Sequence, residues 1–352
     1  MDATLPASLR YSRDQLMASH PYAKPHLEAG YSLHGGLDGA GVYVSPRVLH
    51  RWPAVQAWGA ALEQRGWPLI DATTSLLKLP NYPTVAQERA LLQSGLGQSL
   101  WNALTVTGIV EARGKALVSY VPPDMTKLIV EDIADTATGH LHLGLLETHG
   151  MDEGGGDPRT PDLGAHDAMW FACRDLVFGK DAYPMPPPPE SISRPVDVAR
   201  EMPLIGPEYE GLMKMLMNVL MIEVRAESFF AFCCDVLRDP GLFVDRRPAA
   251  DQAAVLVERI RTDEQIHVAY LQAVISELRS FTLRTTDGRE MPGREIIDPV
   301  WADMVDWHGR RERETSRGRT RAEIERQAIE KLGTDEGRRL IARFDEIEAK
   351  AA

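Results

Sequence analysis

The chain has few cysteines and no long apolar run, and both absences limit what the protein can be. Only three of its 352 residues are cysteine, and two of them, Cys233 and Cys234, are adjacent, so a disulfide framework is not expected. No run of eighteen apolar residues occurs, so no membrane-spanning helix is predicted. The first residues also lack the apolar stretch of a signal peptide, which predicts a cytoplasmic protein.

Positive charge is scarce, and the motifs of several enzyme classes are missing. The 39 Lys and Arg residues against 51 Asp and Glu residues give a net charge of −12, which argues against nucleic-acid binding. No G-x-G-x-x-G follows a predicted strand, and G-x-S-x-G, C-x-x-C and H-E-x-x-H are absent. The sequence therefore predicts neither a nucleotide site nor a hydrolase or zinc site of these kinds.

What the chain does contain is helical periodicity, which dominates from about residue 85. We predict a mainly α protein whose helical bundle covers residues 85–281. An N-terminal extension or cap over 1–84, partly irregular and partly a small α/β unit, precedes it, and a hairpin with a charged helical tail over 282–352 follows. The proline-rich segment 184–195 is predicted to be a stiff crossover, because proline lacks a backbone donor.

Individual elements follow from the positions of apolar residues and of the glycines and prolines that end them. Residues 41–46 and 67–72 are predicted strands, and 151–162 is a predicted loop. The predicted helices are 51–66, 85–114, 122–150, 163–179, 207–241 and 249–281, with further charged helix from Trp307 onward.

Two long predicted helices each carry ionisable residues on their apolar side. Glu223 and Glu227 lie in the most apolar segment of the chain, LMIEVRAESFFAF, and Glu264 and His267 lie three residues apart within the apolar arc of the next helix. Buried carboxylates without partners are costly, and a multivalent cation can bind several of them together with an imidazole. We therefore predict a metal site; salt bridges to Arg225 or Arg261, or protonated glutamates, are the alternatives.

This pattern resembles half of a ferritin-like di-iron carboxylate site. Glu264 and His267 form the E-x-x-H motif, and Glu227 on the antiparallel partner helix precedes Glu264 by 37 residues. The resemblance implies a ferritin-like helical bundle that binds two iron ions, or one iron and one manganese.

The other half of such a site is less clear, because no second E-x-x-H occurs upstream. His140 and Glu147 on helix 122–150 and His166 on helix 163–179 fall within apolar arcs, so we predict them as the remaining ligands. Three residues on another face of the first of these helices are the alternatives: Glu131, Asp135 and His142.

The sequence also resembles a second family, the di-iron oxidases with a haem-oxygenase-like helical fold. That family has an acid and a histidine seven residues apart on an early helix, as Asp135 and His142 are. This chain departs from the pattern in two ways, because the family commonly has Glu at the first position and a His where Ile260 stands.

Either resemblance implies an oxidoreductase that activates O2 and oxidises a small organic molecule. The expected partners are then O2 and a small-molecule substrate. An electron-donor protein and a homodimer are compatible with this function, and no binding to nucleic acid or to a membrane is expected. An iron-storage protein of the ferritin type would use the same ligands without an organic substrate. A non-catalytic helical interaction protein would bind no metal.

Overall fold

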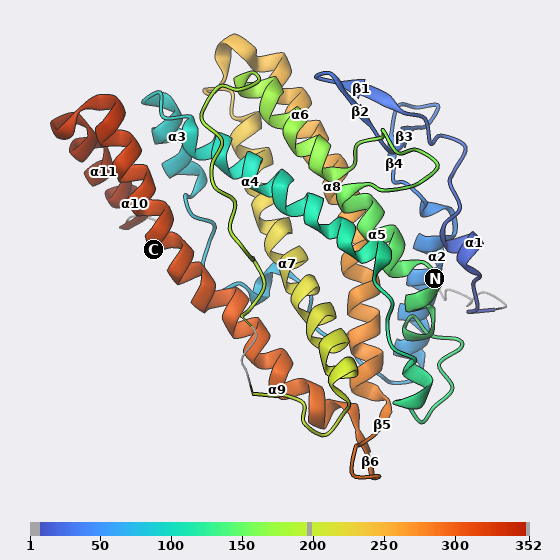
Figure 1. Ribbon diagram of the computed structural model, residues 1–352. Helices are drawn as coiled ribbons and strands as arrows, with labels where there is room; N and C mark the ends of the chain where they lie inside the picture. Colours follow the sequence, from blue (N-terminus) through green and yellow to red (C-terminus); the bar gives the residue numbers. More distant parts are fainter. Residues whose placement is uncertain (1–7, 196–198, 350–352) are drawn as a thin grey trace.

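The computed structural model describes residues 8–195 and 199–349, and it confirms the predicted mainly α class (Figure 1). Small two-stranded sheets lie near the N-terminus and after the longest helices. The helices are α1 (Arg13–Leu16), α2 (Val48–Gln64), α3 (Val85–Gln93), α4 (Gln98–Gly114), α5 (Leu145–Gly154), α6 (His166–Phe178), α7 (Pro207–Arg238), α8 (Arg247–Ser280), α9 (Gly293–Asp306), α10 (Glu312–Leu332) and α11 (Thr334–Ala349). The strands are β1 (His26–Glu28), β2 (Tyr31–Leu33), β3 (Gly36–Leu37), β4 (Tyr43–Val44), β5 (Thr282–Arg284) and β6 (Glu290–Pro292).

The helices α7 and α8 form the central antiparallel pair, as predicted (Figure 1). Helix α7 begins with Pro207, which suits the first turn because its missing donor would be unpaired there, and it ends at Arg238 before Asp239 and Pro240. With 32 and 34 residues, each of the two helices is about 50 Å long at 1.5 Å per residue. They are the scaffold on which the other helices pack.

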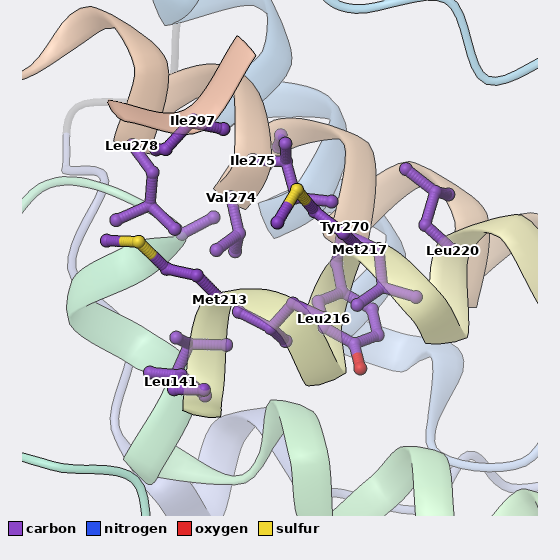
Figure 2. Close-up of a cluster of buried hydrophobic side chains, with 14 of the residues drawn as sticks. Leu141, Met213, Leu216, Met217, Leu220, Tyr270, Val274, Ile275, Leu278 and Ile297 are labelled. Carbon is purple, nitrogen blue, oxygen red and sulfur yellow. The ribbon is translucent and has the colours of Figure 1, made fainter. Parts of the chain in front are cut away.

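Two apolar clusters occupy opposite ends of this pair. At one end, Met213 and Leu216 of α7 pack with Val274 and Leu278 of α8 and with Ile297 of α9 (Figure 2). At the other end, the second half of α7 and the first half of α8 pack with α4 and α6. Each large apolar side chain that is fully buried contributes about 1.5–3 kcal/mol, so these clusters can offset the cost of a polar layer between them.

Part of the predicted helical pattern is wrong upstream of this pair. Residues 122–150 do not form one helix; they contain short 3₁₀ turns, and α5 begins only at Leu145. Gly139 packs so closely that a Cβ there would lie 2.0 Å from the carbonyl oxygen of Ile133, and Gly144 has a φ of +111°. In addition, the backbone N–H groups of Ala137 and Thr138 donate to the Glu277 carboxylate instead of to helix carbonyls. Helix α5 then continues into the segment that was predicted to be a loop.

The predicted helix over 85–114 is also divided, into α3 and α4. Gly95, with a φ of +79°, lies in the break. The strand predicted at 41–46 is present as β4, which pairs with β3, whereas 67–72 contains no strand. The hairpin predicted from Asp287 and Gly288 is confirmed as β5 and β6.

The terminal regions pack onto the helices. Near the N-terminus, His34 donates its backbone N–H to Gly164, just before α6, at 2.9 Å. At the other end, α10 and α11 pack on each other and on α3, burying Ile324, Ile341 and Phe344 (Figure 1). Among the residues that the structure describes, no helix has the length and apolar character required to cross a bilayer.

Candidate metal centre

A cluster of buried histidines and glutamates lies between α4, α5, α6, α7 and α8, in the polar layer that separates the two apolar clusters. Its core is two groups of four residues, and a third group of His34, His166 and Asp263 adjoins them through His166; within each group the potential ligand atoms all lie within 4.8 Å of one another. Glu153 belongs to both groups of four, so the two form one continuous centre that could hold metal ions. The first group is His149, Glu153, Glu223 and His267, and the second is Glu111, Glu153, His166 and Glu264.

In the first group, two imidazoles from α5 and α8 face carboxylates from α5 and α7. His149 Nε2 lies 3.2 Å from Glu223 Oε1 and 3.5 Å from Glu153 Oε1. His267 Nδ1 lies 3.2 Å from the same Glu153 oxygen. The two imidazole rings stack with their centroids 3.9 Å apart, so both present one nitrogen toward Glu153.

In the second group, a single imidazole faces three carboxylates. His166 Nδ1 lies 3.1 Å from Glu264 Oε1, 3.6 Å from Glu153 Oε1 and 3.9 Å from Glu111 Oε2. The other oxygen of Glu264 lies 2.6 Å from His267 Nδ1. Glu264 therefore faces both groups, as Glu153 does.

Three buried polar atoms in this centre have no hydrogen-bond partner: Glu153 Oε1, Glu264 Oε1 and His166 Nδ1. Buried polar atoms are almost always paired, and leaving a charged one unpaired costs several kcal/mol. All three atoms point into the space between the two groups. Bound cations would satisfy all three, and carboxylate oxygens with a minority of imidazole nitrogens suit iron or manganese. The residues present could therefore hold metal ions.

Protons are held in the centre when no metal is bound. Burial and the charge of Glu264 raise the pKa of Glu223 to about 8. Burial and the nearby Glu153 raise the pKa of Glu111 well above its usual range. Burial and the adjacent His149 would lower the pKa of His267, but the surrounding carboxylates raise it to about 10. Because metal ligands must be deprotonated, metal binding has to release these protons.

Buried partners outside the cluster orient its histidines. His267 Nε2 donates to Asp152 Oδ2 at 3.1 Å, and Asp152 is held by Arg47 and by Arg51, the latter at 2.7 Å. Since a carboxylate only accepts, Nε2 keeps its proton, and Nδ1, which faces the cluster, becomes a metal ligand once the imidazolium loses its other proton. Burial opposes ionisation of Asp152, but the two arginines hold its pKa well below the usual range.

The histidines of α5 and α6 have corresponding partners. His166 Nε2 donates to Asp263 Oδ2 at 3.1 Å, and Tyr43 donates its hydroxyl to the same oxygen at 2.8 Å. His149 Nδ1 lies 2.7 Å from the hydroxyl of Tyr270. Such outer partners fix the ring orientation and tautomer of metal-binding histidines.

Close packing of α4 against α5 brings the second group together. A Cβ at Gly114, near the end of α4, would lie 2.5 Å from the Cβ of Glu153. Likewise, a Cβ at Gly154 would lie 2.6 Å from the carbonyl oxygen of Ala112. Glycine at both positions allows the two backbones to approach closely, and this approach puts Glu111 beside Glu153.

No protein-family model, curated protein or solved structure matches this chain. The case for a metal centre therefore depends on its geometry and chemistry. Five helices contribute to the two groups, every contributing side chain is buried, and the atoms without partners converge at one place.

The structure brings together four of the seven residues that the sequence pointed to: Glu223, Glu264, His267 and His166. The other three lie outside both groups. Glu227 is 42% exposed and forms an ion pair with Arg261, the alternative that the sequence had left open. His140 accepts from the backbone N–H of Tyr11 at 2.9 Å and packs on Trp58. Glu147 is paired with Arg13 at 2.6 Å.

The alternative upstream ligands also have other partners. Glu131 accepts from the backbone N–H of Thr282 at 3.0 Å, Asp135 pairs with Arg10 at 2.6 Å, and His142 is exposed. Ile260 is part of the apolar core. Sequence reasoning missed Glu111, His149 and Glu153 in the cluster, and Asp152, Asp263, Tyr43, Arg47 and Arg51 around it.

Proposed function

We propose that this protein is a non-haem oxidase or oxygenase that uses two iron ions, or one iron and one manganese, with O2 to oxidise a small organic molecule. The observation that carries the proposal is the pair of buried four-residue groups that share Glu153. A shared carboxylate is what two adjacent cations require, because it neutralises charge on both and keeps them close together.

The order of the ligands along the chain supports a ferritin-like arrangement. Such sites take a glutamate from each of two helices and a Glu-x-x-His pair from each of the other two. Here α4 and α7 each supply one glutamate, and α8 supplies Glu264 and His267 three residues apart. The second Glu-x-x-His pair of the ferritin-like pattern is absent. In its place α5 supplies His149 and Glu153 four residues apart, and α6 adds His166. The haem-oxygenase-like alternative is less favoured, because Asp135 and His142 lie elsewhere.

The first group would hold one ion and the second group the other, and the bound pair would supply electrons to O2. The chain's own residues orient the ligands and exclude water. Asp152 and Asp263 keep the protons of His267 and His166 on Nε2, so that Nδ1 is available as a ligand. The apolar clusters on both sides keep bulk water away from the centre.

A pocket beside the centre favours an enzyme over an iron-storage protein. It has a volume of about 260 Å³, and its lining includes Glu111 of the second group. Most of the remaining lining is apolar, and the helices α4 and α7 supply the larger part of these apolar residues, including Val110, Ile222 and Phe230. Small-molecule sites are typically apolar concavities with a few polar groups, whereas iron storage requires no such space beside the ligands.

Metal analysis of protein expressed with ample iron tests this function. We expect two ions per chain, and O2 consumption by the reduced, iron-loaded protein that stops after a stoichiometric amount without an organic substrate. Continued uptake of iron beyond two per chain would indicate storage instead. A well-folded protein that takes up neither iron nor manganese would rule out the proposal and leave the interaction protein as the alternative.

Asp263→Asn is expected to weaken metal binding without removing a ligand. The amide is neutral, its oxygen accepts more weakly than a carboxylate and its N–H end cannot accept at all, so the tautomer of His166 is fixed less firmly. Loss of such an outer partner typically costs about 10–100-fold in metal affinity. Competition against a chelator of known affinity measures this change. Asp251→Asn, at an exposed position on the same helix, is the control, and equal affinities in the two variants would contradict the role given to Asp263.

A further inference from the structure

The pocket next to the centre has a distinct chemical character. One face of α7 lines it with Ile222, Arg225 and Phe229, which are spaced three and four residues apart. Helix α4 lines the opposite side, and Arg313 of α10 lies at the part-exposed end. The lining therefore includes both Glu111, a buried residue of the second metal group, and Arg313, which is only partly buried.

The two arginines of this pocket have only neutral hydrogen-bond partners among the described residues. Arg225 donates to His308 Nδ1 at 3.3 Å, and Arg313 donates to the side-chain oxygen of Asn81 at 3.3 Å. The Nε atom of Arg313 is buried and has no hydrogen-bond partner within the described part of the chain. In contrast, Arg321 and Arg326 of the same helix are both paired with carboxylates.

Burying two guanidinium groups without an anionic hydrogen-bond partner costs free energy when no ligand is bound. Burial together with the nearby Arg225 lowers the pKa of Arg313 to about 10, and burial lowers that of Arg225 although the charge of Glu312 partly opposes it. Among the residues that the structure describes, Glu111 is the only acidic residue of the pocket lining, and it already belongs to the second metal group. Two guanidinium groups with unused donors in one pocket, in a chain with a net charge of −12, form a site for an anion.

We propose that the pocket binds an organic anion whose head group lies between Arg225 and Arg313 and whose apolar body extends along Ile222 and Val110 toward Glu111. The head group is a carboxylate or a phosphate, and the body is the part that reaches the metal groups. That this anion is the substrate rests on the proposed function; that the pocket binds it does not.

Calorimetric titration with three probes of equal chain length tests the site: octanoate, octyl phosphate and octan-1-ol. A charge-assisted hydrogen bond contributes enough for about a 10–100-fold change in affinity. We therefore expect the preferred anion to bind at least about tenfold more tightly than the alcohol. Tighter binding of octanoate would identify a carboxylate site, and tighter binding of octyl phosphate a phosphate site.

Arg225→Gln and Arg313→Gln should each abolish most of the preference for the anion over the alcohol. Arg326→Gln, an exposed position on α10, is the matched control and should retain it. Titrations of metal-free protein separate the pocket from the metal, because an anion that binds a metal ion directly would require the metal and ignore both arginines. Such a result, or equal affinities for anions and alcohol, would overturn the inference. If the protein takes up no metal but binds the anion through the two arginines, the anion site is supported and the proposed function is refuted.

Discussion

Glu153→Gln is expected to remove both metal ions at once. Glu153 is the residue that the two groups share, and its Oε1 lies within 3.2–3.6 Å of ligand nitrogens from both. The amide has nearly the same shape but no charge, so it leaves two adjacent cations without the anion between them. The loss of affinity should exceed the roughly 10–100-fold typical of outer partners, and neither ion should remain after gel filtration.

Elemental analysis of the purified variant measures this result, and circular dichroism shows whether the helices are retained. Glu227→Gln is the matched control, because Glu227 has the same side chain and lies on a neighbouring helix, but pairs with Arg261 outside both groups. It should retain two ions per chain. Loss of metal in Glu227→Gln together with retention in Glu153→Gln would contradict the arrangement of the centre.

The half of the centre on α7 and α8 could be predicted because both helices are long, uninterrupted and strongly patterned. Glu223, Glu264 and His267 follow directly from their positions on the apolar faces. Glu227 shows the limit of that reasoning. Four residues correspond to 400°, so Glu227 is turned about 40° from Glu223, and this is enough to place it beside Arg261. An apolar arc broader than 100° cannot separate the two glutamates.

The other half could not be predicted because the helix itself was placed wrongly. Residues 122–150 have an apolar pattern, but the close packing at Gly139 and the positive φ of Gly144 are tertiary features that break it. With α5 starting at Leu145, the inward residues become His149 and Glu153 instead of His140 and Glu147. The glycines after Glu153 favoured a loop in that segment, although the first of them, Gly154, lies within α5 and allows the close packing of α4.

The position of Glu111 on the buried face of its helix can be predicted from the sequence. Glu111 lies seven residues after Leu104 and eleven after Leu100, which are both buried, so it shares their face of α4. The outer partners carried no comparable pattern. Tyr43, Arg47 and Arg51 come from the N-terminal region, and only the folding of that region against α5 and α8 brings them to Asp152 and Asp263.

Metal loading is expected to raise the melting temperature of the protein by about 10–15 °C. Each ion at 1,000 times its dissociation constant stabilises the folded state by about 4 kcal/mol, so two ions contribute roughly 8 kcal/mol. For 352 residues, each with an unfolding entropy of about 2.1 cal/mol/K, 1 kcal/mol corresponds to roughly 1.4 °C, so 8 kcal/mol corresponds to about 11 °C. The metal-free reference is also weakened, because the burial and crowding of its carboxyl groups force Glu111 and Glu223 to take up protons and because buried polar atoms among the described residues of the centre lack partners.

The stabilisation by bound metal is also expected to increase with pH. In the metal-free protein the pKa of Glu223 is raised to about 8 and that of His267 to about 10, so the folded state binds more protons than the unfolded chain between pH 6.5 and 8. The free energy of unfolding of the metal-free protein therefore falls as the pH rises through that window. Metal binding becomes stronger over the same range, because fewer protons compete with the metal for its ligands. The metal-induced rise in melting temperature should be larger at pH 8 than at pH 6.5. Anaerobic thermal scans with and without Mn²⁺ measure it, with Glu153→Gln as the control that should show no rise; an equal rise in that variant would mean that the stabilising metal binds elsewhere.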